Sequence, residues 1–198
     1  MNNTTWDWAI FEALNFDGPV WLDQTMQAIS GKLLWIPLYI LILYMVYRHW
    51  GWRGLISFII AIAVTIAMAD IISGIFKHQG PLKDLWPSFP ARLRPMHTPE
   101  GLDFTQNGYG TAYLYGTVSG HTATIISIAI LSATTIRRRW FSLLMATVAL
   151  LVCYSRVYLA CLFPQDILLG AVVGIIAGRI GVALFRLGLK YPNIRRKI

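Results

Sequence analysis

The sequence contains little charge, few cysteines and no low-complexity tract. Only 13% of its 198 residues are charged, whereas an ordinary soluble domain has about 25%, so such a domain is excluded. The two cysteines, Cys153 and Cys161, lack the spacing of a metal site and make a disulfide framework improbable. No internal repeat is found. The start, Met1–Thr5, carries no basic residue, so no cleavable signal peptide is expected.

Apolar residues make up 56% of the chain, and this share predicts an integral membrane protein with a single domain over residues 1–198. We expect an all-α bundle of five to six transmembrane helices. A spanning helix needs about 20 residues, so the first and third candidates must borrow flanking residues. The five spanning candidates are Leu33–Tyr47, Leu55–Phe76, His121–Ile136, Trp140–Ala160 and Ile167–Leu189.

Two further segments are too polar to span a bilayer. Residues 1–32 mix tryptophans with acids and are broken by Asp17-Gly18-Pro19, so we expect two short helices at the membrane interface, anchored by tryptophan. Residues 77–119 are rich in proline and are predicted to form an external active-site loop. Connections of this length in a small domain are usually functional or disordered.

The net charge is +8, and nine of the 17 lysines and arginines cluster in three places. Five membrane passes bring all three clusters to one side, which the positive-inside rule makes cytoplasmic. The clusters are Arg48 with Arg53, then Arg137 to Arg139, then Lys190 with Arg195, Arg196 and Lys197. We therefore expect contacts with membrane lipids and none with nucleic acid. The amino terminus and the site are predicted outside a bacterial inner (cytoplasmic) membrane, and the carboxyl terminus inside.

Three groups of polar residues are expected to meet at the outer end of this bundle. The first group, Lys77, Arg92 and Arg94, belongs to the external loop. A lysine supplies a mobile point charge and an arginine supplies a planar fork, and both suit phosphate oxygens. Taken alone, these cations could equally contact lipid headgroups.

The second group is Ser119-Gly120-His121, at the start of the third span. Ser119 suits the N-cap position, and the backbone N–H groups of a helix start, together with a glycine, form a seat for an anion. A histidine at this point can donate a proton to a leaving oxygen. The alternative is that Ser119 only caps the helix and His121 only lies at the interface.

The third group is Arg156 with Asp166. Arg156 lies 16 residues beyond Trp140, or roughly 24 Å along the fourth span, which brings it level with the other two groups. Charge at a membrane boundary is costly without a partner, so Arg156 is predicted to bind an anion. Asp166 opens the fifth span, where a carboxylate suits the helix dipole, and it could also be a simple cap.

Together these residues resemble the type 2 phosphatidic acid phosphatase family, and in particular its membrane-embedded lipid phosphatases. The resemblance covers about Asp70–Gly174 and follows the family's motifs in order. The matching residues are Lys77…Arg94-Pro95, then Val118-Ser119-Gly120-His121, then Ser155-Arg156…Asp166.

The resemblance implies roles for these positions. It implies hydrolysis without a metal or other cofactor, through a histidine that attacks phosphorus. The phosphate would be held by Lys77, Arg94, Ser119, Gly120 and Arg156, with Arg92 as a weaker addition, while His121 would be the general acid and Asp166 would orient the nucleophile.

Three positions depart from the family pattern. Leu162 stands where the nucleophilic histidine belongs, and leucine cannot attack phosphorus. The neighbouring Cys161 is a poor substitute, because one helical position turns a side chain by about 100°. Lys77 lies farther from Arg94 than usual, so Lys83 is a second candidate for the motif lysine. Val118 replaces the more common proline.

Two functions follow from the resemblance. The first is a membrane phosphatase of lipid phosphates at the outer leaflet, with phosphatidate, phosphatidylglycerol phosphate, isoprenyl diphosphate or lipid A phosphate as substrate. The second is a catalytically impaired family member, or a variant whose nucleophile was replaced by Leu162, which binds or moves lipid phosphates without hydrolysing them.

Overall fold

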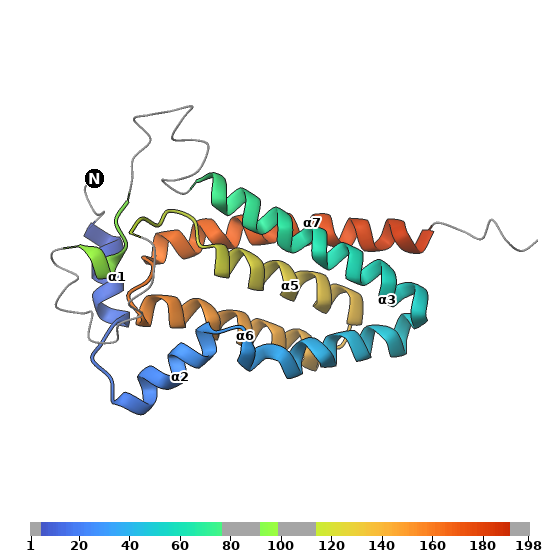
Figure 1. Ribbon diagram of the computed structural model, residues 1–198, viewed down its shortest axis with the longest axis horizontal. Coiled ribbons are helices and arrows are strands. Elements are labelled where there is room, and N and C mark those ends of the chain that lie inside the picture. Colours follow the sequence, from blue (N-terminus) through green and yellow to red (C-terminus); the bar gives the residue numbers. More distant parts are fainter. Residues whose placement is uncertain (1–4, 77–91, 99–113, 191–198) are drawn as a thin grey trace, which may run out of the picture.

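The computed structural model describes residues 5–76, 92–98 and 114–190, whose long helices run along one elongated bundle (Figure 1). The described part is helical apart from turns and one isolated bridge between Leu93 and Tyr115, which confirms the predicted all-α class. The elements are α1 (Thr5–Leu14), α2 (Val20–Ser30), η1 (Leu33–Trp35), α3 (Ile36–Ile75), η2 (Pro95–His97), α5 (Gly120–Ile136), α6 (Arg139–Tyr158) and α7 (Pro164–Lys190).

Helix α3 folds back on itself at Gly51 and so supplies two of the predicted spans. Gly51 has φ 66°, a left-handed conformation that glycine adopts without steric cost, and the helix reverses there (Figure 1). The arms, residues 36–50 and 52–75, correspond to the first two spanning candidates. With α5, α6 and α7 they make five passes along the bundle, as the sequence predicted.

The two ends of the bundle differ in charge. The reversal of α3, the α5–α6 connection and the end of α7 lie together at one end, which we call the basic end (Figure 1). The end of α3, the starts of α5 and α7 and the end of α6 lie at the other, which we call the site end. The basic end carries Arg48, Arg53, Arg137, Arg138, Arg139 and Lys190.

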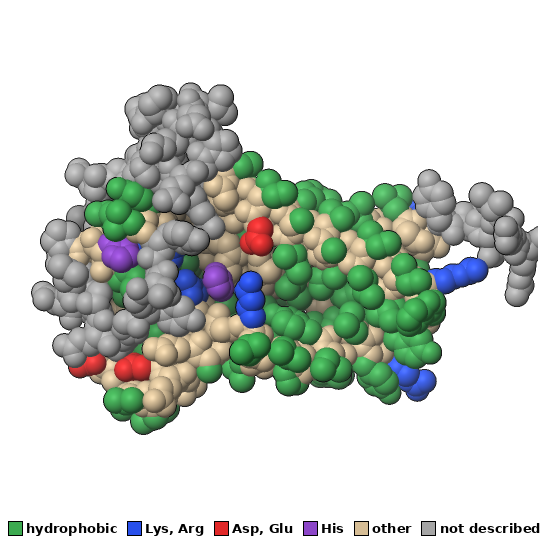
Figure 2. Space-filling view, viewed as in Figure 1, with side chains coloured by type: hydrophobic (Ala, Val, Ile, Leu, Met, Phe, Trp, Pro, Cys, Tyr) green, Lys and Arg blue, Asp and Glu red, His purple; other side chains and the backbone are tan. Residues whose placement is uncertain are grey.

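The flanks between these ends are apolar. Three helices of the described part, α3 with η1, α6 and α7, are long and apolar enough to cross a membrane, and much of their apolar surface faces outward (Figure 2). The chain is therefore an integral membrane protein. Which end faces the cytoplasm remains a prediction from the positive-inside rule.

The core joins both arms of α3 to the other long helices. Phe58 and Phe141 are fully buried, and Phe185 of α7 packs edge-on against both Phe58 and Trp50. The Trp50 indole N–H donates to the carbonyl oxygen of Thr135 at 3.1 Å. This contact ties the reversal of α3 to the end of α5.

A seam of glycines brings α7 close to α5. A β-carbon at Gly170 would lie 2.6 Å from the carbonyl oxygen of Ser119, and one at Gly174 would lie 2.7 Å from that of Ala123. Small residues at such positions let membrane helices approach at backbone distance. The start of α5 is thereby fixed against the start of α7.

The two amino-terminal helices cover the site end. Phe11 of α1 is fully buried against Phe163, whereas Trp6 and Trp21 are 45% and 65% exposed. Asn15 follows α1 and donates to the carbonyl oxygens of Val157 and Tyr158 at the end of α6. The exposed tryptophans suit the predicted interfacial position of residues 1–32, which stays a prediction.

Replacing Gly174 with alanine is expected to lower the stability of the fold by about 1–3 kcal/mol, because the added methyl group meets backbone of α5. Gly74→Ala is the control, since a β-carbon there has no neighbour within 4 Å. Thermal unfolding in detergent should show a lower Tm for Gly174→Ala and an unchanged or slightly higher Tm for Gly74→Ala. Equal Tm values for the two variants would contradict the close approach of α5 and α7.

Candidate active site

The segment 92–98 is held in place by backbone hydrogen bonds to two other parts of the chain. The Arg94 N–H donates to the Leu114 carbonyl oxygen at 3.2 Å, and the Gly116 N–H donates to that of Arg92 at 2.9 Å. The Met96 N–H donates to the Ala160 carbonyl oxygen at 3.1 Å. These bonds place Arg94 between the residues that precede α5 and the α6–α7 connection.

The Arg94 side chain is buried, with 8% of its surface exposed. Its Nε donates to the Tyr115 carbonyl oxygen at 3.3 Å and its Nη1 donates to that of Cys161 at 3.2 Å. The pKa of the guanidinium is lowered, chiefly by burial; the charge of Arg156 acts in the same direction and that of Asp166 opposes it. Arg94 therefore lies within electrostatic range of both residues.

Arg156 reaches the same region from the last turn of α6 and is also buried. Its Nη1 donates to the hydroxyl oxygen of Ser30, at the end of α2, at 2.6 Å. Two buried guanidinium groups, Arg94 and Arg156, thus share the site end. Their mutual repulsion favours an anion between them.

Leu162 lies in the α6–α7 connection beside Arg94. A β-carbon at Gly116 would be 3.3 Å from both the Leu162 Cδ2 atom and the Arg94 Cγ atom. The position that matches the family's nucleophile therefore flanks one of the two buried cations. The side chain there is a buried hydrocarbon.

Cys161 does not offer a replacement nucleophile. Its Sγ lies 3.4 Å from the Leu159 carbonyl oxygen, within hydrogen-bonding distance of its own chain segment. Burial raises the pKa of the thiol, although the charges of Arg156 and Arg94 act to lower it. A buried thiol with a raised pKa contains little of the reactive thiolate at neutral pH.

Ser119 caps α5 as the sequence predicted. Its hydroxyl oxygen accepts a hydrogen bond from the Thr122 N–H at 3.1 Å, and its own N–H donates to the Asp166 carbonyl oxygen at 3.1 Å. Gly120 packs against α3. A β-carbon at Gly120 would lie 3.1 Å from the Ser73 hydroxyl oxygen. His121 is exposed on the first turn. The start of α5 therefore lies at the site end, beside the start of α7.

Asp166 stabilises the start of α7. Its Oδ2 atom accepts from the Phe163 N–H at 3.1 Å, which is half of a capping box. Its Oδ1 atom accepts from Arg92 Nη1 at 3.2 Å. Asp166 is thus a helix cap, which was the alternative interpretation of this residue from the sequence. Its catalytic role stays a prediction.

Arg92 is engaged by carboxylates. It pairs with Asp7 of α1 and with Asp166, and it stacks over the Phe163 ring at 4.1 Å. Asp7 is fully buried and also accepts from the Gln165 N–H at 2.9 Å. In this arrangement Arg92 links α1 to α7, and a role as a phosphate ligand remains a prediction for it.

Several functional positions are outside the described residues or were missed by sequence reasoning. Lys77 and Lys83, the two candidates for the motif lysine, are outside the described residues. The contacts of Asp7 with Arg92 and of Ser30 with Arg156 were not predicted. An acid in the first turn of an apolar, aromatic helix was the available signal for Asp7.

Within the described ranges no three His, Cys, Asp or Glu side chains group as a metal site.

Comparison with known proteins gives one consistent result. The family model described as "PAP2 superfamily" matches residues 60–187 of this chain. The chain is 33% identical over 160 residues to a lipid A 4'-phosphatase of Bacteroides thetaiotaomicron and 30% identical over 158 residues to one of Porphyromonas gingivalis. Each alignment covers 79% of this chain, and 66% and 63% of those two proteins. The chain thus spans just under two-thirds of their length.

Two crystal structures share the fold. That of Aquifex aeolicus LpxE has a TM-score of 0.64 at 21% identity and covers 92% of this chain and 98% of its own. That of a transmembrane PAP2-type phosphatidylglycerolphosphate phosphatase from Bacillus subtilis has a TM-score of 0.63 at 20% identity, covering 98% and 90%.

The Asp7→Asn variant tests the link between α1 and α7. The substitution leaves the Arg92 guanidinium buried with one partner charge removed, which should cost about 3 kcal/mol of stability. Glu12→Gln on the same helix is the control, because Glu12 is exposed. Unfolding in detergent should show a clear loss for Asp7→Asn alone, and equal stabilities would show that the pair does not hold α1.

Proposed function

Because this chain belongs to the PAP2 superfamily, we propose that it is a membrane lipid-phosphate phosphatase with its anion site at the site end. The observation that carries the proposal is the burial of two arginines at the site end, with Arg94 beside Leu162 and Arg156 within electrostatic range of Arg94. Two like charges removed from water favour binding of a phosphate, which can accept hydrogen bonds from both guanidinium groups.

Among lipid phosphates we favour a lipid A phosphate as substrate. The two curated relatives are both named lipid A 4'-phosphatases, and each aligns with 79% of this chain. Phosphatidate, phosphatidylglycerol phosphate and isoprenyl diphosphate are the other candidates. The site end lies at the end of the spanning helices, where the phosphate of a membrane lipid would sit at headgroup depth. We propose that this is the outer leaflet.

The proposed roles divide between holding the phosphate and moving a proton. Arg94 and Arg156 hold the phosphate oxygens with the helix start at Ser119 and Gly120, and Lys77 or Lys83 adds a further charge. His121 acts as the general acid toward the leaving oxygen. Asp166, at the start of α7, orients a nucleophile at residue 162. Arg92 holds the Asp166 carboxylate in place.

Leu162 favours a second function, in which the phosphate is bound and hardly hydrolysed. A covalent route needs a nucleophile at this position, and a leucine side chain has no lone pair to supply. Cys161 beside it is buried with a raised pKa. In this second candidate function, the chain binds lipid phosphate with little turnover as it stands.

The Leu162→His variant decides between the two functions. Purified chain with lipid A or phosphatidate in mixed micelles should release little phosphate, and Leu162→His should release at least about a hundredfold more, because it restores a nucleophile. Leu162→Ala is the control for side-chain size and should stay inactive.

Rapid phosphate release by the unsubstituted chain would defeat the impaired-site proposal and support a different nucleophile. No release by a folded Leu162→His variant would show that residue 162 does not face the phosphate.

Arg156→Ala tests phosphate binding without reference to turnover. It removes a charge-assisted hydrogen bond, so the Kd for a lipid phosphate should rise at least about tenfold. Arg139→Ala at the basic end is the matched control and should leave the Kd unchanged. Arg156→Lys keeps the charge and should recover part of the affinity. Unchanged affinity in a folded Arg156→Ala variant would remove Arg156 from the site.

A further inference from the structure

Helix α7 carries two arginines, Arg179 and Arg186, within an otherwise apolar stretch that is long enough to span a membrane. Arg179 lies 15 residues beyond Pro164, or roughly 22 Å along a helix of about 40 Å. It is therefore near the middle of the span. An arginine at this depth is costly, and such residues mark binding sites or pair with another charge.

No carboxylate of the described residues pairs with these two arginines. All nine acids of the sequence lie at residues 7–23, 70–103 or 166, and none lies in residues 24–69, 104–165 or 167–198. Asp166, the acid on α7 itself, is 20 residues before Arg186 and lies at the site end. Both ion pairs of the described residues involve Arg92 instead. Because the described residues supply no counter-charge for Arg179 and Arg186, an anion bound from outside the protein is a candidate for that role.

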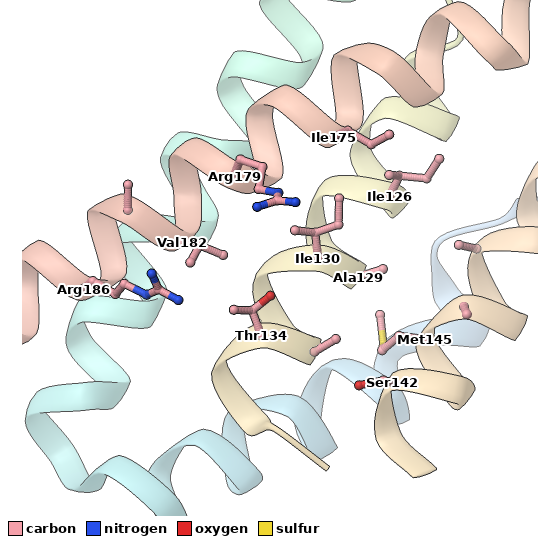
Figure 3. Close-up of a pocket in the computed structure, with 14 residues that line it drawn as sticks. Ile126, Ala129, Ile130, Thr134, Ser142, Met145, Ile175, Arg179, Val182 and Arg186 are labelled. Atoms are coloured by element: carbon pink, nitrogen blue, oxygen red, sulfur yellow. The ribbon is translucent and has the colours of Figure 1, made fainter. Parts of the chain in front are cut away.

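Both arginines line a pocket between α5, α6 and α7. The pocket has a volume of about 750 Å³, and both guanidinium groups extend from α7 toward it (Figure 3). Its walls are mainly apolar, with Thr134 and Ser142 as the hydroxyl-bearing residues. It reaches the basic end, where Ser142 also lines a neighbouring hollow with Arg137 to Arg139. Apolar walls with a few convergent polar groups are typical of ligand sites of this size.

We propose that this pocket binds an anionic phospholipid from the leaflet at the basic end. The lipid phosphate lies between Arg186 and the basic end, and the long side chain of Arg179 extends toward it along the apolar wall. An acyl chain fills the part of the pocket lined by Ile126, Ile130 and Ile175. The proposal does not depend on the activity of the site end, because Arg179 and Arg186 lie 13 and 20 residues beyond Asp166 on α7.

A phospholipid fits these observations better than the alternatives. Free phosphate ions do not enter the hydrocarbon depth of Arg179, whereas a lipid brings its charge with an apolar tail. A second copy of the chain in the same orientation would present its own basic end here, since no acid of the described residues lies at that depth. The charge of the pocket thus selects an anionic amphiphile.

Native mass spectrometry of the detergent-purified full chain tests the proposal. Dioleoyl-phosphatidylglycerol and dioleoyl-phosphatidylcholine are added at equal concentration to the chain and to two double variants. Arg179→Leu with Arg186→Leu removes the pocket cations, while Arg53→Leu with Lys190→Leu removes as much charge from the basic end outside the pocket. We expect the unsubstituted chain and the second pair to retain the anionic lipid, and the first pair to retain at least about tenfold less.

Two further variants and a competing ion distinguish lipid binding in the pocket from binding elsewhere on the chain. Ile130→Trp fills the pocket while keeping both arginines and should also lose the lipid, so the test does not rest on one variant being folded. Arg156→Ala should retain it, which distinguishes the pocket from the site end. Inorganic phosphate at the same concentration should not displace it.

Three results would overturn the proposal. Equal loss in both double variants would show general attraction to the basic end. Equal retention of the two lipids by the unsubstituted chain would show that the headgroup is not recognised. A dimer that disappears when Arg179 and Arg186 are replaced would make this face an interface between copies of the chain.

Discussion

The site end depends on keeping two arginines, Arg94 and Arg156, buried beside each other. Like charges in a medium of low polarity repel strongly, so each guanidinium needs fixed partners that oppose this repulsion. Backbone carbonyl oxygens of Tyr115 and Cys161 hold Arg94, and the Ser30 hydroxyl holds Arg156. These partners are dipoles, and the Asp166 carboxylate acts on Arg94 as a counter-charge. We propose that the two cations together bind an anion within the membrane protein.

The parts that hold this pair come from every region of the chain. The backbone bonds of residues 92–98, the glycine seam between α5 and α7, and the cover formed by α1 and α2 each fix one side. Arg92 and Asp7 join the first and last helices into the same support. The residues of the candidate site thus sit on rigid elements, and rigidity of this kind favours recognition of a phosphate in one geometry.

The sequence predicted what local patterns determine. The five passes follow from apolar length, and the cap at Ser119 follows from a hydroxyl before an apolar helix. The turn between the first two spans was expected from Arg48 and Arg53, and the structure places it at Gly51, where φ is positive. Asp7 was missed because its partners are 85 or more residues away, and no spacing rule relates an ion pair to such a separation. The same holds for Ser30, whose partner is 126 residues distant.

The pairing of Asp7 with Gln165 has a consequence for the order in which the molecule is made. The two residues are 158 positions apart, so at about 5–20 residues per second the ribosome needs roughly ten to thirty seconds to deliver the second after the first. During that time the nascent chain carries an aspartate whose partner Gln165 does not yet exist, and the start of α7 is not yet available to α1. Closure of the site end is therefore a late event of biosynthesis, after the last helix has entered the bilayer.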